Sequence, residues 1–163
     1  MNKTIKKLNI TMIIGILAVW VSGSLFHFVY DWTGKNTFAG LFFPTNESTW
    51  EHMKLVYLPM VLCGCIFLKK FSAQWLLGIL VGTWLIPVLF YTYRGILGFG
   101  ISAFDIGTFF VSVGGAFWIM YHTLETQWEM KVKKWLRIFV IIQGILFVVF
   151  TYHPLNLGIF WEP

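Results

Sequence analysis

The sequence predicts an all-α integral membrane protein: a bundle of five transmembrane helices with a cytoplasmic N-terminus and an extracytoplasmic C-terminus. Three observations support this prediction: the composition, five long apolar stretches, and the one-sided distribution of basic residues. Of the 163 residues, 58% are hydrophobic and 12% are charged, whereas soluble domains carry about 25% charged residues. So short a chain has too little interior to bury so many apolar side chains. A soluble globular protein, a disordered chain and a nucleic-acid-binding domain are therefore disfavoured.

The five apolar stretches approach the roughly 20 residues that a membrane-spanning helix needs. They cover approximately residues 8–30, 47–68, 75–93, 104–121 and 136–152, and the apolar part of the second stretch begins at Leu55. No alternating β pattern is visible, so the spans are expected to be helices. No repeat or linker divides the chain, which predicts a single membrane domain over residues 1–163.

Several residues within the spans bear on helix packing. Pro59 and Pro87 lie inside the second and third spans, where proline bends a helix and frees backbone carbonyl groups. The fourth span contains a run of small residues at 112–116, which predicts close packing against a neighbouring helix. Gln143 lies deep in the fifth span, where an interhelical hydrogen bond is expected.

The basic residues predict the orientation of the bundle. Nine of them precede the first span or lie in the connections after the second and fourth spans: Lys3, Lys6, Lys7, Lys69, Lys70, Lys131, Lys133, Lys134 and Arg137. Only Lys35, Lys54 and Arg94 fall on the other side. Basic residues are enriched in cytoplasmic loops, so the larger group is placed in the cytoplasm. An odd number of spans then puts the C-terminus outside.

Polar side chains form stripes that rise to the outer end of the spans. In the first span Trp20, Ser24, His27 and Asp31 follow one another at intervals of four, three and four residues, which places them on one helix face. Further polar residues begin the second span, end the third and begin the fourth: Asn46, Glu47, Ser48, Glu51, His52, Tyr91, Arg94 and Asp105. Ionisable groups inside a membrane are costly and tend to mark functional sites. We expect the stripes to face one another in one outward-facing cluster.

The chemistry of these side chains suggests three roles in a single site. Carboxylates and imidazoles in proximity can act as acid and base, and the candidate catalytic groups are Glu47, Glu51, His52 and Asp105. Nitrogen and oxygen ligands suit a divalent metal such as zinc, and the candidate metal ligands are His27, Asp31, Glu51 and His52. The candidate substrate contacts are Asn46, Ser48, Tyr91 and Arg94, with Arg94 as a clamp for an anionic group.

Structural explanations of the same residues stay open. Ser48 and Glu51 match a capping box and would then only start the second helix. His27 and Asp31 can form a hydrogen-bonded pair across one helical turn. Arg94 and Asp105 can form a salt bridge that holds the third and fourth spans together.

The connections at the outer end are unusually apolar for loops in water. Residues 37–44, residues 96–104 and the tail at 157–161 are rich in Phe, Leu and Ile. Such segments are expected to lie at the membrane surface or to cover the end of the bundle. An apolar cover over polar groups suits an amphiphilic ligand better than a simple ion.

The segment Phe43-Pro44-Thr45-Asn46-Glu47-Ser48-Thr49-Trp50-Glu51-His52-Met53-Lys54 resembles a motif of small, uncharacterised membrane proteins of Gram-positive bacteria, F-P-x-N-E-S-x-W-E-H-x-K. In those proteins the motif follows a first span with an H-F-x-Y element, here residues 27–30. The resemblance covers the first third of the chain with specificity. It implies a multi-pass protein of the bacterial plasma membrane and implies no activity.

Three hypotheses of function follow from these patterns. The first is a membrane-embedded enzyme with an outward-facing, metal-dependent site that acts on a lipid or other amphiphile. The second is a module that binds or transports a small ligand or ion, or an accessory subunit of a membrane complex. The third is a structural or assembly protein in which the polar cluster only holds the helices together. In all three the lipid bilayer is the expected partner, and no nucleic acid is expected.

Overall fold

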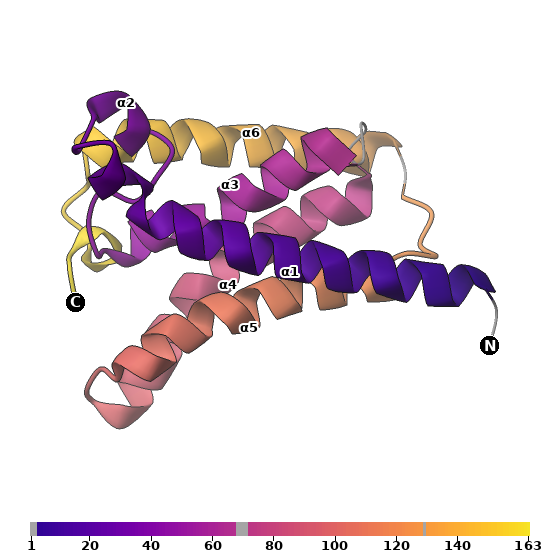
Figure 1. Ribbon diagram of the computed structural model, residues 1–163, viewed down its shortest axis with the longest axis horizontal. Helices are drawn as coiled ribbons and strands as arrows, with labels where there is room; N and C mark the ends of the chain where they lie inside the picture. The colour runs from indigo at the N-terminus through magenta and orange to yellow at the C-terminus, as the bar shows by residue number, and fades with distance from the viewer. Residues whose placement is uncertain (1–2, 68–71, 129) are drawn as a thin grey trace.

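The protein is described by a computed structural model at residues 3–67, 72–128 and 130–163. The described residues form helices joined by turns and loops (Figure 1): α1 (Lys3–Trp32), α2 (Thr37–Gly40), α3 (Thr49–Phe67), α4 (Ala73–Leu97), α5 (Ser102–His122), α6 (Met130–Tyr152) and the short 3-10 helix η1 (Gly158–Phe160). These ranges contain no strand. The predicted all-α class is confirmed.

Four of these helices are long and apolar enough to cross a membrane: Ile10–Trp32 within α1, and all of α4, α5 and α6. They coincide with four of the predicted spans and support a multi-pass membrane protein. Helix α3 is not among them, because its first two turns carry Glu51, His52 and Lys54. The structure therefore confirms four candidate spans and leaves the predicted span at 47–68 unconfirmed.

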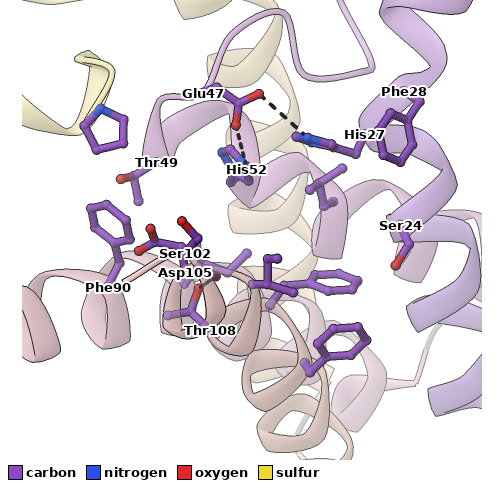
Figure 2. Close-up of a pocket in the computed structure, with 16 residues that line it drawn as sticks. Ser24, His27, Phe28, Glu47, Thr49, His52, Phe90, Ser102, Asp105 and Thr108 are labelled. Atoms are coloured by element: carbon purple, nitrogen blue, oxygen red, sulfur yellow. Dashed lines mark hydrogen bonds and ion pairs between the residues drawn. The ribbon is translucent and has the colours of Figure 1, made fainter. Parts of the chain in front are cut away.

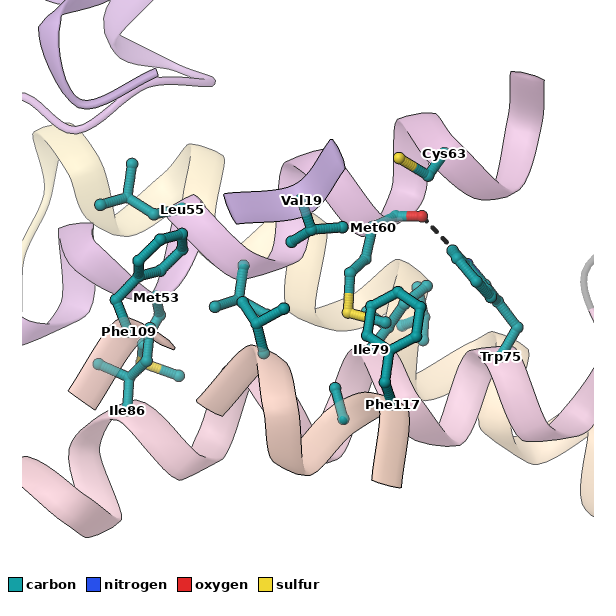
Figure 3. Close-up of a cluster of buried hydrophobic side chains, with 14 of the residues drawn as sticks. Val19, Met53, Leu55, Met60, Cys63, Trp75, Ile79, Ile86, Phe109 and Phe117 are labelled. Carbon is teal, nitrogen blue, oxygen red and sulfur yellow. Dashed lines mark hydrogen bonds between the residues drawn. The ribbon is translucent and has the colours of Figure 1, made fainter. Parts of the chain in front are cut away.

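Helix α3 lies at the centre of the bundle. It contacts α1, α4, α5, α6 and η1, and the side chains of Met53 and Met60 have no exposed surface. Val19 from α1, Ile79 from α4 and Phe117 from α5 belong to the same buried cluster (Figure 3). Because other helices surround α3, its charged side chains face protein rather than lipid.

Near the proline inside α3, helices α1 and α4 make close contacts with backbone carbonyl groups of α3. Pro59 has no backbone N–H, so the Leu55 carbonyl loses its usual helical donor. Gly23 of α1 lies against that carbonyl, and a Cβ at Gly23 would be 2.6 Å from its oxygen. One turn further along, Trp75 of α4 donates its indole N–H to the Met60 carbonyl at 3.0 Å. These contacts hold α1 and α4 against the central helix.

Helices α4 and α5 form a hairpin whose tip leans away from the other helices (Figure 1). In its middle the two helices approach closely, and a Cβ at Gly82 would lie 2.7 Å from the Cβ of Ala116. The expected packing role of residues 112–116 is confirmed for Ala116, whereas Gly114 faces open space. At the tip, Gly98 ends α4 with a φ of 76°, a backbone conformation that favours glycine.

Candidate functional site

A cavity of about 470 Å³ lies between α1, α3 and the α4–α5 hairpin (Figure 2). Its walls are mostly apolar, with Phe28, Leu55, Ile86 and Phe109 among the lining residues. Its polar lining residues come from α1, α3, α5 and the loop before α3: Ser24, His27, Glu47, Thr49, His52, Ser102, Asp105 and Thr108. The first, second and fourth predicted spans thus contribute polar residues to one cavity.

Two histidines converge on one carboxylate at the wall of this cavity. Glu47 Oε1 lies 3.7 Å from His27 Nε2, and Glu47 Oε2 lies 3.4 Å from His52 Nε2. One potential ligand atom from each of the three residues lies within 4.8 Å of the others. These contacts are ion pairs when the imidazoles are protonated, and when the imidazoles are neutral the same atoms form a group that could hold a metal ion.

The local sequence explains how the three side chains meet. His27 lies near the C-terminal end of α1, one turn after Ser24, on the face that the sequence predicted to be polar. Helix α3 begins at Thr49, so His52 is in its first turn and Glu47 is in the loop just before it. The ring of His52 is oriented by its Nδ1, which lies 3.0 Å from the Ser48 carbonyl oxygen. That contact leaves His52 Nε2 facing Glu47.

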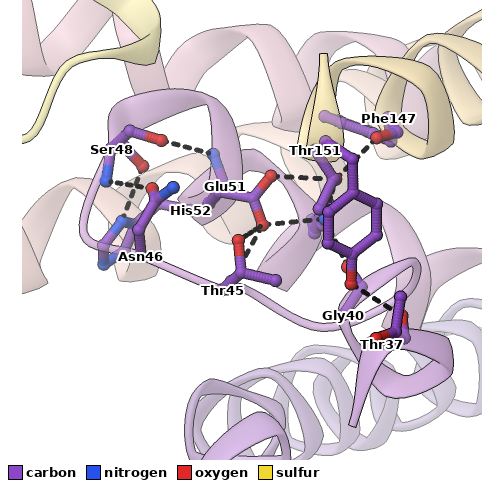
Figure 4. A network of polar contacts seen from close by, with 11 residues as sticks. Thr37, Gly40, Thr45, Asn46, Ser48, Glu51, His52, Phe147 and Thr151 are labelled. Atoms are coloured by element: carbon purple, nitrogen blue, oxygen red, sulfur yellow. Dashed lines mark hydrogen bonds and ion pairs between the residues drawn. The ribbon is translucent and has the colours of Figure 1, made fainter. Parts of the chain in front are cut away.

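Asp31 and Glu51, the other two predicted metal ligands, lie in different surroundings. Asp31 is exposed and faces Lys35 at 4.0 Å. Glu51 is buried and belongs to a network on the opposite side of α3 (Figure 4), where its carboxylate lies 2.8 Å from Lys54 Nζ. The Glu51 backbone N–H donates to Ser48 Oγ at 3.4 Å, so one half of the predicted capping box is present.

Asp105, the remaining candidate catalytic residue, lines the cavity but is held by its neighbours on the hairpin. Arg94 Nη2 donates to Asp105 Oδ2 at 3.0 Å, and the Tyr93 hydroxyl donates to Asp105 Oδ1. Arg94 also donates through Nε to the Tyr93 hydroxyl at 3.1 Å and lies over the Phe90 ring. The salt bridge that the sequence left open as a structural explanation is therefore present.

The other predicted substrate contacts make structural hydrogen bonds. Asn46 Oδ1 accepts from the Ser48 backbone N–H at 3.0 Å, which shapes the loop before α3. The Tyr91 hydroxyl donates to the Gly158 carbonyl at 3.0 Å and ties α4 to the C-terminal segment. Tyr93 was missed by the sequence reasoning, and only its place one residue before Arg94 could have indicated it.

The fold and this site define a multi-pass membrane protein with polar side chains gathered at one largely apolar cavity. The model of DUF6512, a family of unknown function, matches residues 1–163, and the chain belongs to this family. No curated protein and no solved structure matches the chain. The family agrees with the resemblance to uncharacterised proteins, but it shows neither the motif nor a Gram-positive origin.

Proposed function

We propose that the protein is a membrane-embedded, zinc-dependent enzyme that acts on a lipid or other amphiphile. The observation that carries the proposal is the convergence of His27, Glu47 and His52 at the cavity wall. Ligand atoms about 2.0–2.1 Å from a tetrahedral zinc ion lie about 3.3–3.4 Å from one another. One ligand atom from each of the three residues lies within 4.8 Å of the others, so the side chains would move closer together to bind zinc.

The surroundings of His52 support the same proposal. Metal-ligating histidines usually donate their other ring N–H to a carbonyl or carboxylate, which fixes the tautomer. The Ser48 carbonyl, 3.0 Å from His52 Nδ1, is such an acceptor. It favours the tautomer in which Nε2 carries a lone pair for the metal.

A set of two histidines and one glutamate leaves the fourth position of a tetrahedral zinc ion open, and catalytic zinc sites use that position to activate water. His27, Glu47 and His52 all line the cavity, so a substrate in the cavity would reach the open position. The arrangement therefore fits hydrolysis of a bond held at the cavity wall.

The apolar walls favour an amphiphilic substrate. Phe28 of α1 and Ile106 and Phe110 of α5 line the cavity and are also exposed on the bundle surface, by 50%, 61% and 37%. In a bilayer these side chains would border the lipid between α1 and α5. Earlier on α1, Trp20 donates its indole N–H to the Phe110 carbonyl at 3.3 Å and joins the two helices. A lipid could enter from the side, with its chain along the phenyl rings and its head group near the histidines.

We further propose that α3 is a fifth span and that the site faces outward from a bacterial plasma membrane. The 19 residues of α3 extend about 28 Å at 1.5 Å per residue, close to the roughly 30 Å of a bilayer core. The five long helices alternate in direction (Figure 1), and the site lies at the end opposite the start of α6, which carries Lys131, Lys133, Lys134 and Arg137.

Metal analysis of the detergent-purified protein tests the proposal. We expect about one zinc ion per chain in the wild type, loss of the zinc in His52→Ala, and normal zinc in His153→Ala. His153 is exposed and lies outside the three-residue group, so its replacement controls for loss of a histidine. A wild type without zinc, or equal zinc in both variants, would contradict the proposal.

One observation favours a second candidate, a module that binds the amphiphile without converting it. Asp105 is already held by Arg94 and Tyr93, and Glu47 is the proposed ligand, so no free side-chain carboxylate among the described lining residues is left as a general base. Incubation of the zinc-loaded protein with lipid extract separates the candidates. A zinc-dependent product supports the enzyme, whereas recovery of unchanged, stoichiometric lipid supports the binding module.

A further inference from the structure

Glu47 is an exposed residue in a loop, although the proposed metal site needs its carboxylate in one place. Its side chain is 64% exposed, and its only contacts that the structure gives are those with the two histidines. A loop residue that samples other positions would bind a metal ion with lower affinity, because the ligands must be held close to their binding geometry. Something other than Glu47 itself must hold the loop between α2 and α3.

A buried ion pair binds the last residue of α2 and a residue of the loop that follows it (Figure 4). Glu51 Oε2 accepts from the Thr45 backbone N–H at 2.9 Å and faces the Thr45 hydroxyl at 3.3 Å. Lys54 Nζ donates to the Gly40 carbonyl at 3.1 Å and to Glu51 Oε2 at 2.8 Å. Two residues that precede Glu47 in the chain, Gly40 and Thr45, are thus hydrogen-bonded to side chains of α3.

Thr151 connects the pair to α6. Its hydroxyl oxygen accepts from Lys54 Nζ at 2.6 Å and lies 3.0 Å from Glu51 Oε1. With this contact the Lys54 ammonium has three acceptors, one for each of its protons. Tyr152, the next residue, donates to the Thr37 carbonyl at 2.7 Å and holds α2 on the same side.

We propose that Glu51, Lys54 and Thr151 are positioning residues that hold the loop so that Glu47 meets His27 and His52. This inference rests on the proposed metal site. It adds that side chains which do not bind the metal hold the loop that carries one of the ligands. It gives Glu51 a role different from the ligand role that its carboxylate suggests in the sequence. Loss of groups that orient ligands lowers metal affinity by about 10- to 100-fold, and a similar loss is expected here.

The test compares two valine variants that remove one hydroxyl each. Thr151→Val removes the link between the ion pair and α6. Thr83→Val is the matched control, because the Thr83 hydroxyl is fully buried in α4 and has no hydrogen-bond partner among the described residues. Thr151→Ser keeps the hydroxyl and serves as the rescue. Zinc affinity is measured with a competing chelator in full-length, detergent-purified protein, and amide hydrogen exchange of residues 41–48 is measured in the metal-free protein.

We expect Thr151→Val to bind zinc about 10-fold more weakly and to exchange faster across residues 41–48, with Thr83→Val and Thr151→Ser close to the wild type. A Val56→Ala variant, which only removes core volume from α3, shows what a general loss of stability does to zinc affinity. Equal weakening in Val56→Ala and Thr151→Val would overturn the inference, as would unchanged affinity in Thr151→Val. Absence of zinc binding from the wild type would overturn the proposed function and this inference together.

Discussion

The buried charged side chains that the structure describes, those of Glu51 and Lys54, have partners for their polar atoms. The side chains of Glu51 and Lys54 are each 2% exposed, yet Lys54 Nζ reaches three acceptors and both Glu51 oxygens accept hydrogen bonds. Removing a charge from water is costly, and pairing with complete hydrogen bonding offsets that cost. The pair therefore holds together only as a unit with Gly40, Thr45 and Thr151.

This dependence predicts a difference between single and double variants of the pair. Lys54→Met alone leaves the Glu51 carboxylate buried without its counter-charge, and we expect a loss of about 3–5 kcal/mol in unfolding free energy. The double variant Glu51→Gln with Lys54→Met removes both charges and should recover most of that loss. The measurement is denaturant unfolding in detergent, followed by tryptophan fluorescence. Equal stability of the single and double variants would contradict the coupling.

The Arg94–Asp105 pair at the hairpin tip is more exposed and is expected to contribute less. Its side chains are 26% and 30% exposed, and ion pairs in contact with water contribute about 0–1 kcal/mol. We expect Asp105→Asn to lower the unfolding free energy by about 1 kcal/mol, because the asparagine weakens the bonds from both Arg94 and Tyr93. Thermal unfolding against Glu125→Gln, an exposed control, checks this prediction. A large loss of zinc with unchanged stability would instead place Asp105 in the metal site.

At the scale of elements, the packing of α4 against α5 depends on where small residues fall. Gly82 lies inside the interface, where an added Cβ would meet Ala116 at 2.7 Å and Val56 at 3.1 Å. Gly114 lies on the same hairpin with nothing within 4 Å of an added Cβ. The two glycines are thus a matched pair for testing the interface.

We expect Gly82→Ala to destabilise the protein by about 1–3 kcal/mol, because the extra methyl group overpacks a close helix contact. Gly114→Ala should be neutral or stabilising by up to about 1 kcal/mol, since alanine favours a helix over glycine. Unfolding midpoints of the two variants test the prediction. An equal loss of stability in both variants would contradict the packing explanation.

At the scale of the whole molecule, the arrangement of the five long helices predicts which loops share a side of the membrane. The tail after α6 lies at the end of the bundle where α3 begins, whereas the α5–α6 connection lies at the other end (Figure 1). Because α6 lies between them, these two segments are on opposite sides if α6 spans the membrane. With a cytoplasmic N-terminus, the proposed fifth span α3 puts the tail outside and the α5–α6 connection inside. Asn156 and Gln127 are exposed positions in the two segments.

Cysteine labelling in intact cells tests that topology. In a background of Cys63→Ala and Cys65→Ala, we expect a membrane-impermeant maleimide to label Asn156→Cys from outside, and to label Gln127→Cys only after lysis. With a cytoplasmic N-terminus, labelling of Gln127→Cys but not Asn156→Cys from outside would contradict the five-span arrangement, and labelling of both from outside would contradict α6 as a span.

Much of the fold could be predicted because long apolar stretches leave few alternatives. A backbone in lipid must satisfy its own hydrogen bonds, so each stretch becomes a helix, and the predicted spans at 8–30, 75–93, 104–121 and 136–152 overlap α1, α4, α5 and α6. The spacing of Ser24 and His27 likewise indicated the face of α1 that lines the cavity. Local periodicity was enough for these features.

The sequence alone could not separate Glu47 from Glu51. If the second helix began at residue 47, the two carboxylates would share one helix face, and both would be candidates for the same site. The helix begins at Thr49 instead, so Glu47 lies in the loop beside the histidines while Glu51 points toward Lys54 and Thr151. The partner that settles the role of Glu51 lies 100 residues away in the chain, beyond the reach of any local pattern.

The sequence by itself determined the helical class, four candidate spans and the set of polar residues at one end of the bundle, because composition and helical period constrain each segment locally. The tertiary structure decided that α3 is the central helix, that His27, Glu47 and His52 meet at a cavity, and that Asp105 is held by Arg94 and Tyr93. Those outcomes depend on contacts between different helices, which the pattern within one segment does not specify. The packing of the helices, and not the local sequence, determines that Glu47 lies beside the histidines and Glu51 beside Lys54.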